Sequence, residues 1–481
     1  MDYEIVIGLE VHTHLKTLTK AFCGCSTLFG APANTQVCPV CLGFPGSLPV
    51  LNEKLLEYGI KTGLALNCRI PEFTKFDRKH YFYPDLPKNY QISQYDLPLA
   101  VNGFLDIELA GYKKKISIKR VHMEEDAGKL IHDGDFSLVD YNRSGMPLLE
   151  IVSEPEINSP DEAYEYLTGL KAILKYLEVS DCDMEKGSLR CDANISLRPQ
   201  GQKELGTKTE LKNLNSFKAV RDALIYEAKR QKDLLEAGQR IIQQTLLWDD
   251  AAGKSQPMRS KEEAMDYRYF PEPDLPPFTL SLERIQAITN KLPELPAALK
   301  GRLIKDYGLG SYEAGILTAE KAMAGYFEAV YKLYPNAKII SNWLIGPLTY
   351  ELNSRKLAIA GTAQCAVPAL DPEHLAGLLE AVEKGKISNL AAKDVLTQML
   401  DSGKSADSII EEKGLAQISD ASELSAAADK VIAENAKSVS DYKAGKANAL
   451  MFLLGQVMKQ TKGKANPKIV QEILKEKLSN A

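Results

Sequence analysis

The sequence lacks a long hydrophobic run and a strong excess of charge of either sign. Its 481 residues contain no stretch of about 18 consecutive apolar residues, so we expect no helix that crosses a membrane. The formal net charge is −5, which gives no sign that the chain as a whole binds a polyanion. The opening residues Met1-Asp2-Tyr3-Glu4 are acidic, which predicts no secretory signal peptide and therefore reduced or metal-bound cysteines.

Three signatures of common enzyme classes are also missing. The chain has no G-x-x-x-x-G-K-[ST] loop, which excludes a P-loop nucleotide site. Gly308-Leu309-Gly310 lacks the third glycine and the preceding strand of a dinucleotide-binding fingerprint. No G-x-S-x-G and no glycine- and serine-rich nucleophile loop occurs. If this protein uses ammonia from an amide donor, another subunit must therefore release it.

The chain changes character at two places, which predicts three domains. Leu292-Pro293-Glu294-Leu295-Pro296 is a stiff, extended connection, and Asp401-Ser402-Gly403-Lys404-Ser405 has the small polar residues of a linker. We therefore place domains at residues 1–292, 293–405 and 406–481. We predict an α+β fold in which a mixed β-sheet domain is followed by two all-α domains.

Local patterns predict individual elements of the first domain. Alternating residues indicate strands near residues 5–12, 116–122, 189–197 and 207–214. Ser159-Pro160-Asp161-Glu162 is a capping box that predicts a helix start, and Asn215-Ser216 predicts a second helix, which ends at Gly238. In the third domain, residues 443–481 carry eight lysines and two acidic residues, so a basic helical segment is expected there.

Four cysteines have the spacing of a metal-binding knuckle. Cys23-Gly24-Cys25 and Cys38-Pro39-Val40-Cys41 form two short-spaced pairs separated by a loop. Such pairs can present four thiolates tetrahedrally to zinc, and four protein ligands make the site structural rather than catalytic. The alternative is four unligated thiols. The remaining cysteines are isolated, which predicts buried packing for Cys68, Cys182, Cys191 and Cys365.

Polar residues alternate along several predicted strands, so each set lies on one face of its strand. The sets are Glu10, His12 and His14; Arg190, Asp192 and Asn194; and Lys208, Glu210 and Lys212, and the run from His122 to Gly128 adds Glu124, Glu125 and Asp126. A shared face of this kind would crowd acids together, which requires a cation. Carboxylates with an imidazole suit Mg²⁺ or Mn²⁺, and the interleaved cations suit phosphate. A phosphoryl-transfer site is one reading, and a solvated polar face is the other.

Two segments interleave basic and aromatic residues. One runs from Arg78 to Gln91 and contains Lys79 and Tyr81, and the weaker one runs from Tyr267 to Asp274. Such a loop can stack an unpaired base and hold its phosphate. Packing of the tyrosines on the core is the alternative.

Together these motifs resemble the B subunits of the aspartyl/glutamyl-tRNA(Asn/Gln) amidotransferases of the bacterial heterotrimeric type. The resemblance extends over nearly the whole chain, and its most specific stretches are His122–Lys129, Asp140–Glu150, Arg190–Asn194, Thr207–Asn213, Tyr267–Asp274 and Gly445–Pro467. It implies a catalytic cradle domain, a helical domain and a helical tail that holds tRNA. It also implies two partner subunits in the same complex, an amidase (glutaminase) and a small third protein, together with a bacterial cytoplasm and no membrane.

The resemblance implies a ligase reaction in two steps. ATP phosphorylates the side-chain carboxylate of Glu-tRNA(Gln) or Asp-tRNA(Asn), and ammonia then displaces phosphate to give the amide. The amidase partner would release the ammonia from glutamine. Whether one mischarged tRNA or both are substrates stays open.

Roles for individual residues also follow from the resemblance. The implied Mg²⁺ ligands are Glu10, His12, Glu125 and Glu210, with Glu124 and Asp192 close by, and it stays open which of Glu124 and Glu125 faces the site. Arg190, Lys208 and Lys212 are the implied cations for phosphate and substrate carboxylate. Substrate contacts are expected at Lys79, Tyr81, Arg143, Asp192, Asn194 and Lys212. Zn²⁺ at the four cysteines would be structural.

Two other functions compete with this expectation. In the first, the chain is a zinc-stabilised scaffold that binds tRNA, and its strand carboxylates are solvated. In the second, it is a metal-dependent hydrolase built on Glu10 and His12, although no general base outside the metal cluster is evident.

Overall fold

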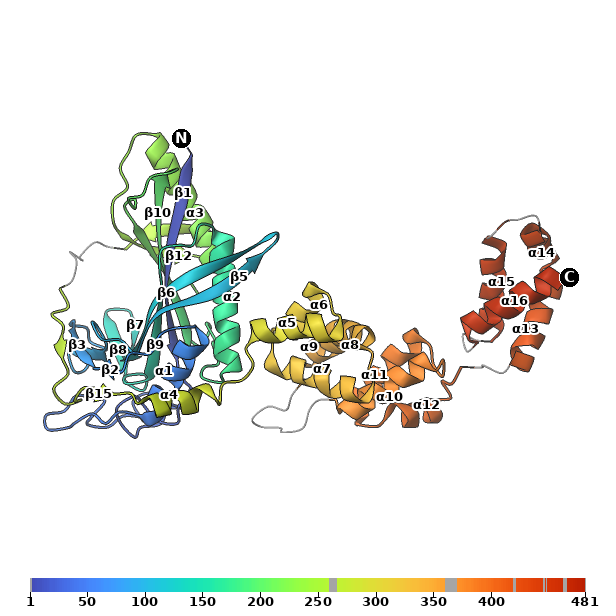
Figure 1. Cartoon of the computed structure of the whole chain (residues 1–481), viewed down its shortest axis with the longest axis horizontal. Helices are drawn as coiled ribbons and strands as arrows, with labels where there is room; N and C mark the ends of the chain where they lie inside the picture. The colour runs from blue at the N-terminus through green and yellow to red at the C-terminus, as the bar shows by residue number, and fades with distance from the viewer. Residues whose placement is uncertain are drawn as a thin grey trace. The chain divides into compact units, whose positions relative to one another are not determined.

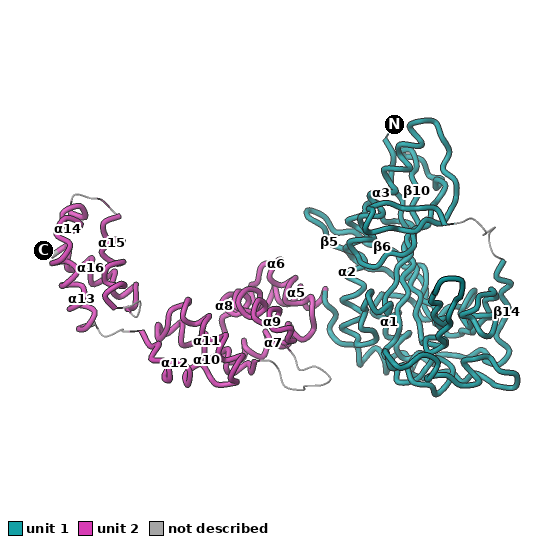
Figure 2. Tube along the Cα trace, turned by 180° about the vertical axis from the view of Figure 1, so that it is seen from behind, with its two compact units in different colours: residues 1–296 teal, residues 297–481 magenta. Residues whose placement is uncertain are grey.

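The computed structural model of this chain describes residues 2–258, 266–359, 370–417, 421–443, 446, 448–461 and 465–480. Cys365 and parts of the basic segment 443–481 lie outside these residues. The chain divides into two compact units, residues 1–296 and residues 297–481, which Figure 2 shows in different colours. Each unit is described by itself.

The first unit is built around an eight-stranded sheet with the order β13-β12-β11-β10-β1-β9-β6-β5. Its strands are β1 (Tyr3–His14), β5 (Ala100–Leu109), β6 (Tyr112–Glu125), β9 (Pro147–Ser153), β10 (Leu189–Pro199), β11 (Thr209–Lys212), β12 (Thr245–Asp249) and β13 (Lys254–Pro257). Neighbouring strands are antiparallel except β11 and β12, which are parallel. The predicted α+β class with a mixed sheet is therefore confirmed.

Helices cover one face of this sheet (Figure 1). They are α1 (Glu53–Ala65), α2 (Pro160–Tyr176) and α3 (Phe217–Glu236), which pack on β6, β5 and β10 respectively. Ser159 and Ser216 cap α2 and α3 by accepting backbone hydrogen bonds, as the sequence predicts. Because side chains alternate along a strand, the apolar residues of β1 face these helices and its polar residues face away.

Smaller sheets complete the first unit. They are β14-β3-β4 (Phe270–Pro271, Asp77–His80, Tyr90–Ser93), β15-β2 (Phe278–Thr279, Phe73–Thr74) and β7-β8 (Lys129–Asp133, Phe136–Asp140), and helix α4 spans Leu282–Thr289. Arg78 on β3 donates two hydrogen bonds, of 2.7 Å each, to the buried carboxylate of Glu272. This bidentate pair holds the Tyr267–Asp274 segment against β3.

The second unit is helical. Its elements are α5 (Pro296–Tyr307), α6 (Ser311–Leu317), α7 (Lys321–Leu333), α8 (Ala337–Trp343), the π-helix η1 (Leu344–Leu348), α9 (Thr349–Arg355), α10 (Pro372–Glu383), α11 (Asn389–Ser402), α12 (Ala406–Lys413), α13 (Ala421–Glu434), α14 (Ala436–Lys443), α15 (Asn448–Gln460) and α16 (Pro467–Asn480). Helix α12 packs on α10 and α11, whereas α13, α15 and α16 share a separate apolar cluster that begins at Leu424. Within the residues that the structure describes, we find no helix with the length and hydropathy of a membrane span.

Candidate functional site

Polar side chains from four neighbouring strands meet on the face of the sheet that the helices leave uncovered. Residues directly opposite each other in an antiparallel pair point to the same face, with Cβ atoms about 5 Å apart. His12 on β1 lies opposite both Arg190 on β10 and Glu150 on β9. Glu150 in turn lies opposite His122 on β6. The register therefore places a row of four titratable or charged groups across the sheet.

His12, Glu124 and Glu150 form the centre of this site. One ligand atom from each of the three side chains lies within 4.8 Å of the other two. Glu124 and Glu150 are only 2% and 8% exposed. The Nε2 atom of His12 is 3.7 Å from the Oε2 atom of Glu150, while Gln91 and Ser93 on β4 donate hydrogen bonds to Glu124. These carboxylates are therefore buried and held in place.

The electrostatics of these three groups favour a bound cation. Burial and the charge of Glu150 raise the pKa of Glu124 to about 7. Burial alone would raise the pKa of Glu150, but His12 holds it below its ordinary value. Burial would lower the pKa of His12, and contact with Glu150 outweighs that effect and raises it. Two buried carboxylates with one imidazole are a donor set that fits Mg²⁺ or Mn²⁺.

A second acidic group lies beside the first. Glu10 is opposite Asp192 in the β1–β10 pair, and Asn194 is opposite Glu210 in the β10–β11 pair. Asn194 donates a 3.1 Å hydrogen bond to Glu10. The Nζ atom of Lys212 is 3.4 Å from Asp192 and 3.3 Å from Glu210, so it bridges the two carboxylates. Burial, followed by the charge of Glu150, raises the pKa of Glu10. The predicted ligands thus fall into two neighbouring groups.

A pocket of about 270 Å³ opens next to the second group. Its lining includes Gly8, Glu10, Ser153, Asn194 and Lys208. Lys208 is exposed and lies just before β11, so its side chain is not held among the buried carboxylates. A pocket with glycine in its wall and a flexible cation at its edge can admit a phosphorylated ligand beside the acids.

Asp126, which follows β6, brings further cations to the site. Its Oδ2 atom is 2.7 Å from His14 Nε2 and 2.6 Å from the guanidinium of Arg190. Arg143 lies 3.5 Å from the same oxygen and donates a 3.0 Å hydrogen bond to the carbonyl of Ala127. The charge of Arg190 and the hydrogen bond from His14 outweigh burial and hold the pKa of Asp126 well below its usual range.

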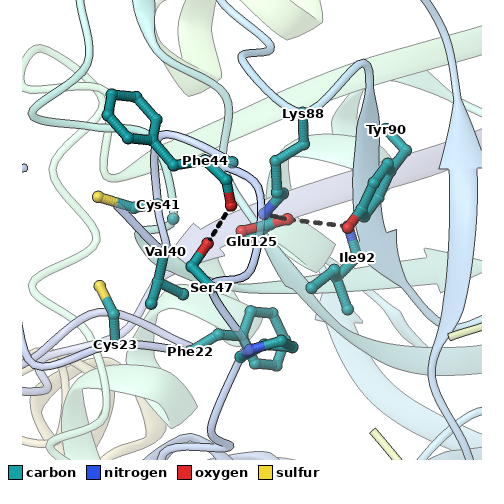
Figure 3. A pocket seen from close by; sticks show the side chains of 13 residues that line it. Phe22, Cys23, Val40, Cys41, Phe44, Ser47, Lys88, Tyr90, Ile92 and Glu125 are labelled. Carbon is teal, nitrogen blue, oxygen red and sulfur yellow. Dashed lines mark hydrogen bonds and ion pairs between the residues drawn. The ribbon is translucent and has the colours of Figure 1, made fainter. Parts of the chain in front are cut away.

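Glu125 faces away from the cluster formed by His12, Glu124 and Glu150. Because Glu124 and Glu125 are neighbours on β6, their side chains leave the strand on opposite faces. Glu125 forms an ion pair with Lys88 and accepts a 2.9 Å hydrogen bond from the backbone of Ile92. It lines a separate pocket of about 100 Å³ (Figure 3). The structure does not bring this expected ligand to the others, and it turns Glu124 toward them.

Lys79 and Tyr81 lie on the aromatic side of the site. Lys79 on β3 is 4.9 Å from the ring of Tyr267 and 6.0 Å from the ring of Tyr81. Burial alone would lower the pKa of Lys79, but the nearby charge of Glu124 helps to raise it above its usual value. Tyr269 stacks on Tyr95 with ring centroids 4.3 Å apart. The two aromatic segments that the sequence separates by about 190 residues therefore meet here.

The four spaced cysteines converge. Their Sγ atoms lie within 4.8 Å of one another, and those of Cys38 and Cys41 are 3.9 Å apart. Tetrahedral thiolates with metal–sulfur bonds of about 2.3 Å would lie about 3.8 Å apart, so the donor set fits zinc. Hydrogen bonding with Cys23 and the charge of Lys20 oppose burial and lower the pKa of Cys41 to about 4. Figure 3 shows the side chains of Cys23 and Cys41 on the same side of the pocket that they help to line.

The sequence alone assigned no role to Glu150 and Asp126, two residues that lie at the centre of the site. Glu150 is the one charged residue of β9 (Pro147–Ser153), and a single carboxylate in an apolar strand is itself a signal, because a buried glutamate needs a partner. Asp126 follows Glu124 and Glu125 in a run of three acids. Its role could not be distinguished from theirs without the register of the sheet.

Comparison with known proteins places the sequence among relatives over its full length. Residues 5–286 match the family described as the GatB/GatE catalytic domain, and residues 325–478 match the GatB domain. Among the aspartyl/glutamyl-tRNA(Asn/Gln) amidotransferase B subunits, that of Caldanaerobacter subterraneus subsp. tengcongensis is 58% identical over 480 residues, which cover 100% of both chains. The B subunits of Carboxydothermus hydrogenoformans and Moorella thermoacetica are each 56% identical, and each match covers 99% of this chain. The matches cover 99% of the Carboxydothermus protein and 100% of the Moorella protein.

Proposed function

This chain belongs to the family of aspartyl/glutamyl-tRNA(Asn/Gln) amidotransferase B subunits, and we propose that it converts the mischarged amino acid on tRNA to its amide. The side-chain carboxylate of Glu-tRNA(Gln) or Asp-tRNA(Asn) would first take a phosphoryl group from ATP. Ammonia would then displace phosphate and leave the amide on the tRNA. The chain would act as one subunit of a ligase complex.

The observation that supports this function best is the buried cluster of His12, Glu124 and Glu150 beside strong cations. Solvated carboxylates would suit a passive tRNA scaffold, but Glu124 and Glu150 are buried. Mg²⁺ bound to this cluster would supply charge stabilisation to the phosphate oxygens of ATP. The face also carries Arg190, whose guanidinium can offset the charge that develops as the phosphoryl group moves.

The neighbouring groups have distinct roles in this proposal. Glu10, Asp192 and Glu210 supply a second set of carboxylates beside the pocket that Lys208 borders, where the nucleotide would lie. Lys208 and Lys212 would contact phosphate, and Asn194 would hold Glu10 in place. Arg143 and Lys79 would bind the substrate carboxylate, and Tyr81 would contact the acceptor end of the tRNA. Glu125 is not included among the metal ligands, because it leaves β6 on the opposite face and its Oε1 atom binds Lys88 and the backbone of Ile92.

The partners follow from the chemistry and from the family. A carboxylate must be activated before ammonia can attack it, and this sequence has no amidase nucleophile loop. We propose that an amidase (glutaminase) partner delivers ammonia and that a small third protein completes the complex. The basic residues of 443–481 would contact tRNA phosphates, which position a substrate without reading its sequence. Zn²⁺ at the four cysteines would stabilise the fold.

Glu210→Gln in the purified complex tests the phosphorylation step. The variant keeps the size of the side chain and removes one carboxylate charge, so we expect ATP hydrolysis that depends on mischarged tRNA to fall by about a hundredfold or more. Release of ammonia from glutamine should remain, and Glu185→Gln, which changes an exposed glutamate, should have no effect. Added free ammonia should not restore amidation, because the acyl phosphate does not form. Restoration by ammonia would show that Glu210 serves ammonia delivery instead.

A further inference from the structure

Lys20 is a fully buried lysine that contacts the cysteine cluster. Its side chain is 0% exposed. The Nζ atom lies 3.6 Å from the Sγ atom of Cys41 and donates a 3.3 Å hydrogen bond to the carbonyl oxygen of Tyr141. In the part of the chain that the structure describes, the contacts of this ammonium group include no carboxylate. A buried ammonium ion needs an anionic partner, and the Cys41 sulfur is the group in place to supply it.

A metal-bound cysteine cluster supplies that charge. Four thiolates around one divalent cation carry a net charge of −2, so a neighbouring ammonium group stabilises the occupied cluster. We propose that Lys20 is the counter-ion of a metal-bound Cys41 thiolate and that it couples metal binding to the loop that carries Arg143. This inference rests on the proposal that the four cysteines bind a divalent metal such as zinc.

The coupling has a continuous structural basis in the loop of residues 141–146. On the cysteine side, Ser144 donates a 3.2 Å hydrogen bond to the carbonyl of Cys41, and the backbone N–H of Ala21 donates to the carbonyl of Gly145. Gly145 has a φ of +82°, and a Cβ atom there would lie 3.4 Å from both Cys41 and Lys20, so the two segments pack closely.

The other side of the same loop reaches the candidate site. The backbone N–H of Gly145 donates a 2.9 Å hydrogen bond to the carbonyl of Asp126. Asp126 binds Arg190 and lies 3.5 Å from Arg143. Loss of the metal would leave the Lys20 ammonium without its anion, and the loop would loosen at Tyr141 and Ser144. Arg143 would then lose its fixed position beside Asp126.

The direct test measures metal retention in the assembled complex. Lys20→Met keeps the length of the apolar stem and removes the charge, so we expect zinc to be lost to a chromogenic chelator at a 10- to 100-fold lower chelator concentration than in the wild type. Lys16→Met is the matched control, because Lys16 is exposed on the same segment and should not alter retention. In the wild type, removal of zinc should increase hydrogen exchange in residues 141–146.

The outcomes separate this inference from the metal proposal. A wild-type protein that binds no metal after anaerobic purification would overturn both. A wild type that holds zinc while Lys20→Met holds it equally tightly would overturn the role of Lys20 alone. Unchanged exchange in residues 141–146 after zinc removal would overturn the coupling.

If Lys20→Met folds poorly, the effect of this substitution can be compared in two backgrounds, with and without the four cysteines. In a background with serine at Cys23, Cys25, Cys38 and Cys41, the buried ammonium has no thiolate partner. Lys20→Met should therefore raise the melting temperature in that background and lower it in the wild-type background. A change of the same sign in both backgrounds would refute the counter-ion role.

Discussion

Glutamine substitutions at the neighbouring residues Glu124 and Glu125 should have different effects. A carboxylate oxygen of Glu124 lies within 4.8 Å of ligand atoms of His12 and Glu150, whereas Glu125 is held by Lys88. Glu124→Gln removes one ligand charge from the proposed Mg²⁺ site. We expect the Mg²⁺ concentration for half-maximal activity to rise about 10- to 100-fold. ATP hydrolysis dependent on mischarged tRNA should fall by roughly a hundredfold or more.

Glu125→Gln should act on stability instead. It leaves the Lys88 ammonium, which is 9% exposed, without its carboxylate. Removing one partner of a buried ion pair typically destabilises a protein by about 3–5 kcal/mol. We therefore expect a lower melting temperature with an unchanged Mg²⁺ requirement in the protein that remains folded.

The assay for both variants is a Mg²⁺ titration of ATP hydrolysis in the purified complex, with and without mischarged tRNA. Thermal unfolding of the same samples reports the stability effect, and Glu185→Gln serves as an exposed control. If Glu125→Gln raises the Mg²⁺ requirement and Glu124→Gln does not, then the metal does not bind where His12, Glu124 and Glu150 meet, and our assignment of the site is wrong.

Three further predictions address other parts of the chain. Removal of residues 418–481, after helix α12, should weaken tRNA binding and reduce its salt dependence, because the basic lysines of residues 443–481 are lost; an unchanged tRNA affinity would refute this. Arg78→Met should destabilise the first unit by about 3–5 kcal/mol in a denaturant titration, because the buried carboxylate of Glu272 loses its cation and keeps only the hydrogen bond from the backbone of Asp274, and adding Glu272→Met should recover most of the loss. Burial would raise the pKa of Glu162, but the hydrogen bonds that its carboxylate accepts from Asn158 and Lys114 outweigh burial and lower the pKa. The ionised carboxylate of Glu162 therefore stabilises the fold above a pH of about 4.3, and this contribution is lost as the pH falls through the lowered pKa of the folded state. The difference in melting temperature between the wild type and Glu162→Gln should therefore shrink in acid and not in base.

Elements set by local pattern could be predicted from the sequence. The period-two alternation of β1 placed Glu10, His12 and His14 on one face, because adjacent residues of a strand point to opposite faces. The helix starts at Ser159 and Ser216 depend on side-chain hydrogen bonds to backbone groups a few residues away. Each of these features is determined within about a dozen residues, and the structure confirms them.

Which strands lie next to each other could not be predicted in this way. Glu150 is opposite His12 only because β9 pairs with β1, and 137 residues separate the two in the chain. The grouping of Asp192 with Glu210 likewise depends on the pairing of β10 with β11 and on Lys212, whose ammonium group bridges the two carboxylates. For Glu124 and Glu125, the strand continues to Glu125, so alternation applies to both, but only the register of β6 with β9, which places His122 opposite Glu150, shows which face is the site.

The face of the sheet that carries His12, Glu124 and Glu150 lowers the stability of the fold, but it supplies the groups that the proposed reaction needs. Buried carboxylates that repel one another are tolerated because the opposite face, with Leu9, Val11 and Ile151, packs on helices and fixes the strands. Arg190 and Lys212 neutralise part of the charge within the site. Burial, together with the charge of Glu150, raises the pKa values of Glu10 and Glu124, and a divalent cation bound here would offset both effects. In the proposed reaction, Mg²⁺ bound at this site would stabilise the charge arrangement that phosphoryl transfer requires, and this links the fold to the proposed function.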